Sequence, residues 1–234
     1  MLEIINYHKN YGDKEVVKGI DLKVNKGEIF GFIGHNGAGK TTTIKSIVGI
    51  LPFEEGKILI DGKSVVDFPI ECKSITAYLP DNPDLYENLT GIQYVNFICD
   101  IYEVENSVRN QRIEELGKEL EIYDNLGDSI SSYSHGMKQK VALIGALVHE
   151  PKLLVLDEPF VGLDPKAAFT FKNRMKKMCE NGASIFFSTH ILEVVEKLCD
   201  KVAILKDGEI VRMGATEDII KDQSLEEVFL GIEK

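Results

Sequence analysis

No apolar run in this 234-residue sequence approaches the ~18–20 residues that a membrane-spanning helix needs. The longest runs, 141–148 and 29–33, are typical of a buried helix and a buried strand. Residues 1–6 lack the charged-then-apolar order of a signal peptide, and residues 231–234 contain no lipidation motif. The four cysteines are far apart and show no metal-ligand spacing, so we expect reduced thiols in a cytosolic protein.

Positive charge is scarce, because 27 Lys and Arg residues stand against 38 Asp and Glu residues, a net charge of −11. Broad electrostatic binding to nucleic acid needs clustered Lys and Arg, so this balance argues against it without excluding a local basic patch. The sequence also contains no internal repeat and no linker rich in Gly or Ser. With 44% hydrophobic residues, we expect one compact folded unit.

Segments with strand character alternate with segments of helical periodicity along the chain. Strands are predicted over 2–7, 16–24, 27–34, 57–60, 74–79, 153–156, 185–188, 202–205 and 210–213. Helices are predicted over 40–50, 91–102, 108–120, 137–148, 166–179 and 191–198, with two short helices at the end. This order predicts an α/β fold with a largely parallel sheet and an antiparallel part near the start. We expect a core of residues 1–81 and 151–234 and a helical subdomain over 82–150.

The pattern G-x-x-x-x-G-K-T of a P-loop occupies residues 34–41, between a predicted strand and a predicted helix. Its glycines let backbone N–H groups turn inward around phosphate oxygens, and the helix adds its positive N-terminal dipole. Lys40 is expected to reach the β- and γ-phosphates, and the Thr41 hydroxyl to bind Mg²⁺. The predicted nucleotide-binding residues here are Gly34, His35, Asn36, Gly37, Ala38, Gly39, Lys40, Thr41 and Thr42.

An acidic pair, Asp157 and Glu158, follows the apolar run 153–156. Carboxylates at the carboxyl end of a buried strand lie where α/β proteins form ligand sites. An Asp-Glu pair in this position is often only a solvated turn, but the P-loop upstream favours a functional pair. We expect Asp157 to hold Mg²⁺, through water, and Glu158 to polarise the attacking water.

Together with the segment 133–140, these motifs resemble the ATP-binding cassette (ABC) ATPases over essentially the whole chain. Tyr133-Ser134-His135-Gly136-Met137 is similar to the ABC signature, usually L-S-G-G-Q, in a form common among bacterial exporter ATPases. The resemblance implies that Ser134 and the Gly136 backbone bind the γ-phosphate of ATP held by a second copy. A Ser-x-Gly turn that opens a helix is also an anion site on physical grounds. The alternative is an ordinary helix cap by Ser134.

Three further elements of the family appear in the expected order. The segment 162–164 is similar to the D-loop, which crosses the dimer interface and brings Asp164 toward ATP. His190 matches the switch histidine, and the resemblance implies that it contacts the γ-phosphate and orients the water together with Glu158. Tyr11 resembles the aromatic residue that stacks on adenine. Taken alone, the histidine suits a surface or capping position and the tyrosine suits packing.

Asp81 departs from the family pattern, because the family usually has Gln at this position. Asp81 either keeps an oxygen contact with Mg²⁺, or its loop serves only as a coupling surface for the membrane partner. The apolar residues that follow within 82–89 either contact that partner or pack on their own domain. The charged stripe over 105–121 is predicted to be a solvated helix face.

The resemblance implies a Mg²⁺-dependent ATPase that works as a head-to-tail homodimer or as a pair with a related ATPase. ATP would lie between Lys40 of one copy and Ser134 of the other. The predicted role is the energy subunit of a membrane transporter, most similar to exporters, with an integral membrane permease as partner and no nucleic acid. The chain is then cytoplasmic and held at the inner face of the membrane by that partner. The alternative is a soluble ABC ATPase that acts on ribosomes or nucleic acid without transport.

Overall fold

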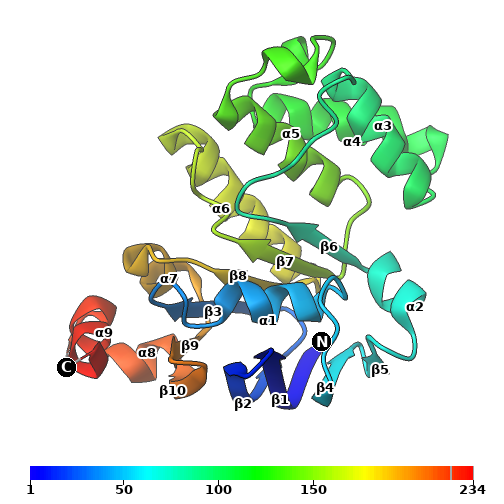
Figure 1. The fold of residues 1–234 in the computed structure, drawn as a ribbon. Helices are drawn as coiled ribbons and strands as arrows, with labels where there is room; N and C mark the ends of the chain where they lie inside the picture. Colours follow the sequence, from blue (N-terminus) through cyan, green and yellow to red (C-terminus); the bar gives the residue numbers. More distant parts are fainter. Residues whose placement is uncertain (222, 234) are drawn as a thin grey trace.

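The chain forms two β-sheets with helices around them, in a computed structural model that describes residues 1–221 and 223–233 (Figure 1). The first sheet is antiparallel and has the strand order β2-β1-β4-β5. Its strands are β1 (Leu2–Tyr11), β2 (Lys14–Val24), β4 (Glu55–Ile60) and β5 (Lys63–Ser64). The expected antiparallel part near the start of the chain is therefore confirmed.

The second sheet has the order β10-β9-β3-β8-β7-β6 and is parallel except for its edge strand β10. Its strands are β3 (Ile29–Gly34), β6 (Thr76–Leu79), β7 (Leu153–Asp157), β8 (Ser184–Ser188), β9 (Lys201–Lys206) and β10 (Glu209–Ala215). Strands β3, β7 and β8 are buried along their whole length, as their continuous apolar runs predict. The carboxyl ends of these three strands form one edge, where Gly34, Asp157 and Ser188 lie.

Helices cover both faces of the second sheet and fill the segment between β6 and β7. The helices near the sheets are α1 (Lys40–Ile47), α2 (Pro69–Ser74), α6 (Pro165–Glu180), α7 (Leu192–Leu198), α8 (Thr216–Ile220) and α9 (Leu225–Glu233). Between β6 and β7 come α3 (Gly91–Ile101), α4 (Asn106–Glu119), two 3₁₀ turns (Tyr123–Asn125 and Ile130–Ser132) and α5 (His135–Leu147). Figure 1 shows α3, α4 and α5 grouped at the end of the molecule away from the antiparallel sheet.

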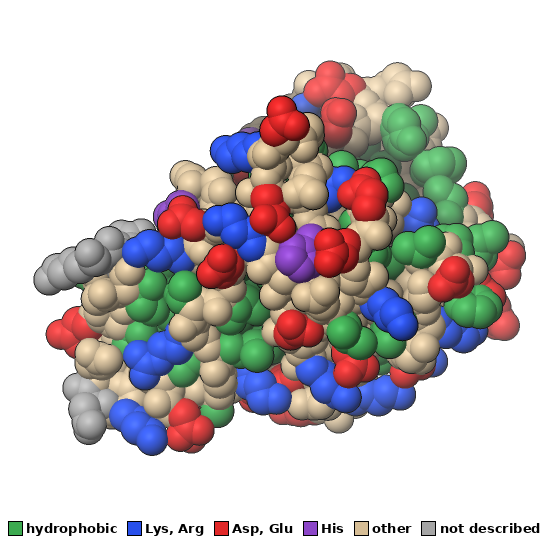
Figure 2. All heavy atoms as spheres, turned by 60° about the horizontal axis from the view of Figure 1, so that its bottom comes forward, with side chains coloured by type: hydrophobic (Ala, Val, Ile, Leu, Met, Phe, Trp, Pro, Cys, Tyr) green, Lys and Arg blue, Asp and Glu red, His purple; other side chains and the backbone are tan. Residues whose placement is uncertain are grey.

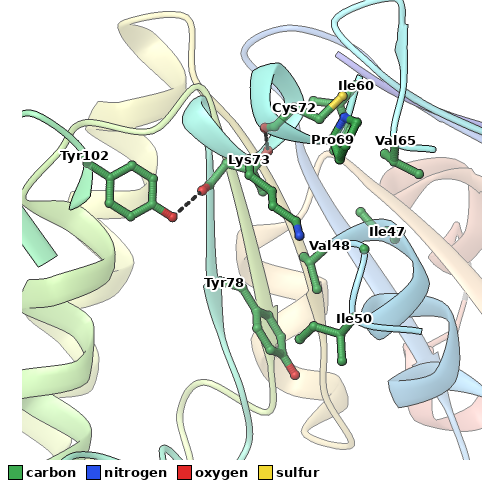
Figure 3. Close-up of a pocket in the computed structure, with 12 residues that line it drawn as sticks. Ile47, Val48, Ile50, Ile60, Val65, Pro69, Cys72, Lys73, Tyr78 and Tyr102 are labelled. Carbon is green, nitrogen blue, oxygen red and sulfur yellow. Dashed lines mark hydrogen bonds between the residues drawn. The ribbon is translucent and has the colours of Figure 1, made fainter. Parts of the chain in front are cut away.

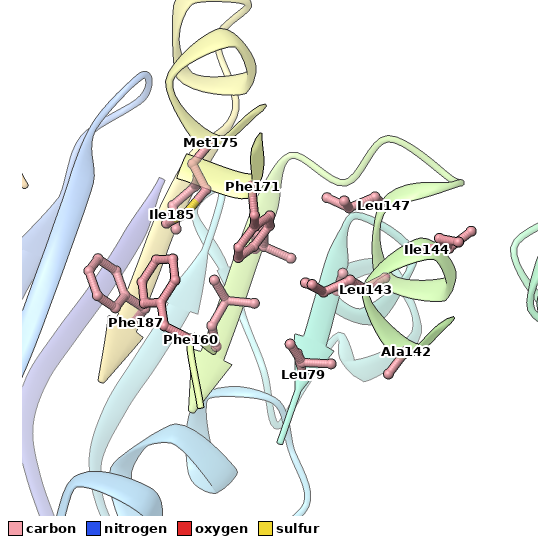
Figure 4. Close-up of a cluster of buried hydrophobic side chains, with 14 of the residues drawn as sticks. Leu79, Ala142, Leu143, Ile144, Leu147, Phe160, Phe171, Met175, Ile185 and Phe187 are labelled. Carbon is pink, nitrogen blue, oxygen red and sulfur yellow. The ribbon is translucent and has the colours of Figure 1, made fainter. Parts of the chain in front are cut away.

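Two apolar clusters hold these layers together. One lies between the two sheets and contains Tyr7, Phe32 and Phe186. The other joins α5 and α6 to strands β6 to β8, with Phe171 and Phe187 among its fully buried side chains (Figure 4). Burying a side chain of this size stabilises the fold by roughly 1.5–3 kcal/mol. The strand ends that carry the polar residues therefore rest on a rigid frame.

The predicted elements differ from the structure mainly at their ends. The strand predicted over 74–79 begins at Thr76, because residues 69–74 form α2 with Pro69 in its first turn. Helix α1 ends at Ile47 rather than at residue 50, and Gly49 follows with φ of +70°. Neither α2 nor the two-residue strand β5 was predicted.

The charged stripe of α4 is not only a solvated face, which corrects the expectation for 105–121. Arg174 on α6 forms ion pairs with Glu115 at 2.7 Å and with Glu119 at 3.1 Å. Lys166, at the start of α6, pairs with Glu121. Partly exposed pairs of this kind each contribute about 0–1 kcal/mol, so their effect is to orient α4 against α6 rather than to stabilise the chain strongly.

The remaining expectations concern the membrane, the thiols and the surface charge. None of the helices within the described residues is long and apolar enough to cross a membrane. All four cysteines are buried free thiols, as expected. Figure 2 shows that basic side chains on the face of the antiparallel sheet are interspersed with acidic ones.

Candidate nucleotide site

The P-loop joins β3 to α1 in a conformation that its glycines permit. A Cβ atom on Gly34 would lie 2.4 Å from the Leu205 carbonyl oxygen, so only glycine fits beside β9. Gly39 precedes α1 with φ of +109°, a backbone conformation that is strained for other residues. Because Gly39 has no side chain to cap the helix, the first N–H groups of α1 face the loop and favour an anion there.

Lys40 places a buried ammonium group inside this loop. Its Nζ donates hydrogen bonds to the carbonyl oxygens of Gly34 at 2.7 Å and His35 at 3.1 Å. Burial lowers the pKa of Lys40, and the nearby carboxylates of Glu158 and Asp157 oppose that shift. The arrangement holds a cation where the P-loop motif predicts phosphate groups.

Asp157 ends β7 with its carboxylate almost fully buried, at 3% exposure. The Thr41 hydroxyl donates a hydrogen bond of 2.7 Å to Oδ2, and the Ser188 hydroxyl bonds to Oδ1. Hydroxyl and carboxylate oxygens are the hard oxygen ligands that Mg²⁺ prefers. The described residues contain no group of three His, Cys, Asp or Glu able to hold a metal. A Mg²⁺ ion usually takes one or two carboxylates together with substrate phosphates, so Thr41 and Asp157 fit it.

Glu158 follows with φ of +49°, an uncommon conformation for a residue with a side chain. This backbone directs its carboxylate toward His190, whose Nδ1 lies 2.9 Å from Oε2. The backbone N–H of His190 also donates to Oε2 at 3.3 Å. Glu158 and His190 follow the neighbouring strands β7 and β8. They therefore form a pair beside the P-loop.

Two cavities meet at these residues. One of about 490 Å³ is lined by His35, Asp81, Glu158 and His190 among others. The other, of about 390 Å³, runs from Glu158 past Gly37 and Thr42 to Tyr11. Tyr11 is 49% exposed, so its ring is accessible at the far end of this cavity. The predicted P-loop residues, the acidic pair, His190 and Tyr11 are thus brought together.

The cavity near Tyr11 is also lined by Lys14 and Val16, which the sequence analysis missed. Neither belongs to a motif, and both lie at the start of β2, after a turn whose geometry the sequence does not specify. Lys9 adds a second cation near this end, with its Nζ 5.6 Å from the centre of the Tyr11 ring. Phe229 of α9 lines the other cavity, and no sequence signal connects it with the P-loop.

Asp81 lines both cavities and so faces the acidic pair. Burial raises the pKa of Asp81, and the negative charges of Asp157 and Glu158 raise it further. In the loop that follows, Leu85 is buried in the chain's own core, whereas Tyr86 is 56% exposed. The apolar residues of 82–89 therefore divide between packing and exposure.

The signature segment lies elsewhere on the chain. Ser134 is exposed and caps α5, accepting a hydrogen bond of 3.3 Å from the Met137 N–H. Among the described residues that line the two cavities, neither Ser134 nor Gly136 is present. One chain does not bring its signature to its own P-loop.

The predicted D-loop packs beside this signature. A Cβ atom on Gly136 would lie 2.8 Å from the Gly162 carbonyl oxygen, so the two backbones are in close contact. Asp164 caps α6 through the Ala167 N–H at 2.8 Å and pairs with Lys140 of α5 at 2.8 Å. The hydrogen bond from Lys140, and then that from Ala167, lowers the pKa of Asp164. The segment thus positions Asp164 against α5 of its own chain.

Comparison with known proteins agrees with this geometry. A family profile described as ABC transporter matches residues 17–161. An uncharacterized ABC transporter ATP-binding protein of Nostoc sp. is 40% identical over 210 residues, which are 89% of this chain and 62% of that protein. The chain therefore spans slightly less than two thirds of that relative. The linearmycin resistance ATP-binding protein LnrL of Bacillus subtilis is 34% identical over 219 residues, 94% of this chain and 70% of that protein.

The solved structures include one described as the ATP binding subunit of an ABC transporter. It has 35% sequence identity and a TM-score of 0.96, and the match covers 100% of both chains. The profile covers more than half of the present chain, and the curated relatives exceed 30% identity. This chain belongs to the family of ABC transporter ATP-binding subunits, the ABC ATPases.

Proposed function

We propose that this chain hydrolyses Mg²⁺-bound ATP and uses dimer closure and reopening to drive a separate membrane permease, as an exporter. The observation that carries the proposal is the convergence of Lys40, Thr41, Asp157, Glu158 and His190 at one sheet edge. These five side chains come from distant parts of the sequence. Their grouping supplies a phosphate-binding cation, a metal site and a base in one cavity.

Each group has a part in hydrolysis. Lys40 and the P-loop N–H groups hold the β- and γ-phosphates. Thr41 and Asp157 would hold Mg²⁺, which when bound would neutralise negative charge on the phosphates. Glu158 accepts a proton from the attacking water, while His190, whose ring Nδ1 lies 2.9 Å from the Glu158 carboxylate, orients both. A bond forms from the water oxygen to the γ-phosphorus, the bond to the β–γ bridging oxygen breaks, and ADP and phosphate leave.

A second copy, or a related ATPase, would complete this site. Ser134 is exposed at the start of α5, where the helix N-terminus favours a γ-phosphate from the facing chain. Asp164 lies beside this signature through its pair with Lys140. We propose that residues 82–150 act as the helical subdomain that carries the signature, and that 1–81 and 151–234 act as the nucleotide-binding core.

The permease would dock on an apolar groove beside the site. A cavity of about 190 Å³ lies between the end of α1, α2 and Tyr102 (Figure 3). Next to it, Tyr78 and Tyr102 also line a cavity that reaches Leu85. Large apolar side chains are exposed on the bordering elements, namely Ile50, Val66, Phe68, Ile70, Tyr86, Phe97 and Ile101. Exposed apolar surface of this kind marks an interaction site, and for a transporter subunit the partner is a cytoplasmic segment of the permease.

The names of the relatives support the proposed direction of transport. The resistance role named for the Bacillus relative favours an exporter of a drug, peptide or lipid. Docking on a permease would hold the chain at the cytoplasmic face of the membrane. Both relatives described above are named as ATP-binding proteins and one as part of a transporter, which favours transport over action on ribosomes or nucleic acid.

The test is an affinity capture of this chain from detergent-solubilised native membranes, followed by mass spectrometry. We expect a multi-spanning protein near one-to-one. Ile70→Asp and Ile101→Asp, at 79% and 57% exposure, should remove it. Val211→Asp on β10, at 45% exposure, is the matched control and should retain it. Ribosomal proteins without a membrane protein would overturn the transporter role.

A further inference from the structure

Ser188 stands at the carboxyl end of β8, directly beside the acidic pair. The two strands are in register there, because Asp157 of β7 is paired with Ser188 of the parallel strand β8. Ser188 is fully buried, at 0% exposure. A hydroxyl group buried at this depth needs a hydrogen-bond partner, and its position determines which partner is available.

Ser188 contacts both carboxylate residues through different atoms. Its hydroxyl donates to Oδ1 of Asp157, and its carbonyl oxygen accepts the Glu158 N–H at 3.1 Å. The second bond holds the backbone at the residue with φ of +49°. One residue therefore fixes the side chain of Asp157 and the backbone from which Glu158 extends.

The Asp157 carboxylate is held from both sides. The Ser188 hydroxyl occupies Oδ1, and the Thr41 hydroxyl lies 2.7 Å from Oδ2. Because a carboxylate is planar, fixing Oδ1 also fixes the direction in which Oδ2 faces. Without the Ser188 hydroxyl, a buried oxygen loses its partner and the group is free to rotate away from Thr41.

We propose that Ser188 is a positioning residue, whose buried hydroxyl turns the Asp157 carboxylate so that Oδ2 and the Thr41 hydroxyl together receive a divalent cation. This inference rests on the proposed ATPase site. Outer partners that orient a metal ligand typically change metal affinity by about 10–100-fold when they are removed.

The test measures how much Mg²⁺ is needed to tighten ADP binding, by calorimetry with no hydrolysis. For Ser188→Ala we expect the Mg²⁺ midpoint to rise ~10-fold, with ADP affinity in EDTA unchanged. Ser188→Thr keeps the hydroxyl and should restore the midpoint. Ser188→Cys keeps the volume with a weaker donor and should lie between them, which preserves the test if the alanine variant does not fold.

Ser184→Ala is the matched control. Ser184 lies on the same strand and is also fully buried, but its hydroxyl donates to the Asn25 carbonyl oxygen at 2.9 Å, away from the acidic pair. It should lose stability while keeping the parent Mg²⁺ midpoint. A parent-like midpoint in Ser188→Ala, or an equal shift in Ser184→Ala, would overturn the positioning role alone. A parent protein whose ADP binding ignores Mg²⁺ would overturn the proposed site as well.

Discussion

The nucleotide edge and the signature helix are held in different ways. At the nucleotide edge, hydrogen bonds join residues far apart in sequence, such as Thr41 with Asp157 and His190 with Glu158. At the signature, the Ser134 hydroxyl bonds only to a backbone N–H three residues away. The side chains of the first region are thus cross-linked and partly buried. At the signature, the long-range contacts come from other residues, such as Lys140 with Asp164, and Ser134 itself is an exposed helix cap.

This difference has a direct consequence for function. Cross-linked groups lose little freedom when a ligand arrives, so the nucleotide edge is preorganised to bind ATP within one chain. The signature offers the same kind of anion site, but within the described residues Ser134 and Gly136 line neither nucleotide cavity. The contrast supports the proposal that one chain binds nucleotide but needs a second copy for turnover.

The largest expected effect is at Glu158. Glu158→Gln keeps the size of the side chain but removes the base, so we expect turnover to fall by about 10²–10⁴-fold. ATP binding should remain, and the dimer should persist because hydrolysis no longer reopens it. Size-exclusion chromatography with ATP checks the dimer, and phosphate release checks turnover. A variant that stays monomeric with ATP, beside an active parent, would contradict the sandwich.

Ser134→Ala tests the role of the signature, the second region of this comparison. Because Ser134 lies outside the chain's own nucleotide cavities, we expect ATP affinity of the monomer to stay unchanged while turnover drops about 10-fold from one lost charge-assisted hydrogen bond. Loss of the α5 cap should also cost about 1 kcal/mol of stability. Thr90→Ala, which removes the cap of α3, is the control for that cost. Equal loss of turnover in the control would remove the special role of the signature.

His149 lies between α5 and β7, at the junction of the two regions compared here. Its ring stacks on Tyr102 with 3.6 Å between centroids, and both ring nitrogens are buried with no well-formed hydrogen bond to the residues that the structure describes. Burial lowers the pKa of His149 to about 4 from 6.5. The unfolded chain then takes up a proton first as pH falls, so the free energy of unfolding decreases from pH 6.5 toward pH 4.

His149→Phe should retain the stack and flatten this dependence. Between pH 6.5 and pH 4, we expect the free energy of unfolding to fall by ~2 kcal/mol less in the variant than in the parent. Urea unfolding at each pH measures this. Tyr102→Phe keeps the stacked ring and the imidazole of His149, so it is the control and should keep the parent slope. An unchanged slope in His149→Phe would show that this junction does not limit stability in acid.

Asp81 should give the smallest effect. If its loop serves as a coupling surface, Asp81→Ala leaves the Mg²⁺ dependence and basal turnover of the isolated protein unchanged. A raised Mg²⁺ requirement would instead assign Asp81 to the metal. Asp84→Ala in the same loop controls for a general loss of negative charge.

The motif residues could be predicted because each has a local cause. Gly34 and Gly39 are required by the backbone, and the apolar run before Asp157 marks a strand buried on both faces. Helix α2 was missed because its six residues have too little periodicity to separate them from the strand that follows. Glu115 and Glu119 of α4 were misjudged because their partner, Arg174, lies on α6, 59 and 55 positions away in the sequence.

The sequence by itself determined the α/β class, the P-loop, the acidic pair and the family. All of these depend on the spacing of residues along the chain, which can be read from the sequence alone. Only the tertiary structure decided the contacts that no motif carries: Ser188 with Asp157, Arg174 with Glu115, and Phe229 with the cavity beside the P-loop. The reason is that strand order in a parallel sheet, β3-β8-β7, follows crossovers rather than chain order, so neighbours at its edge come from distant positions.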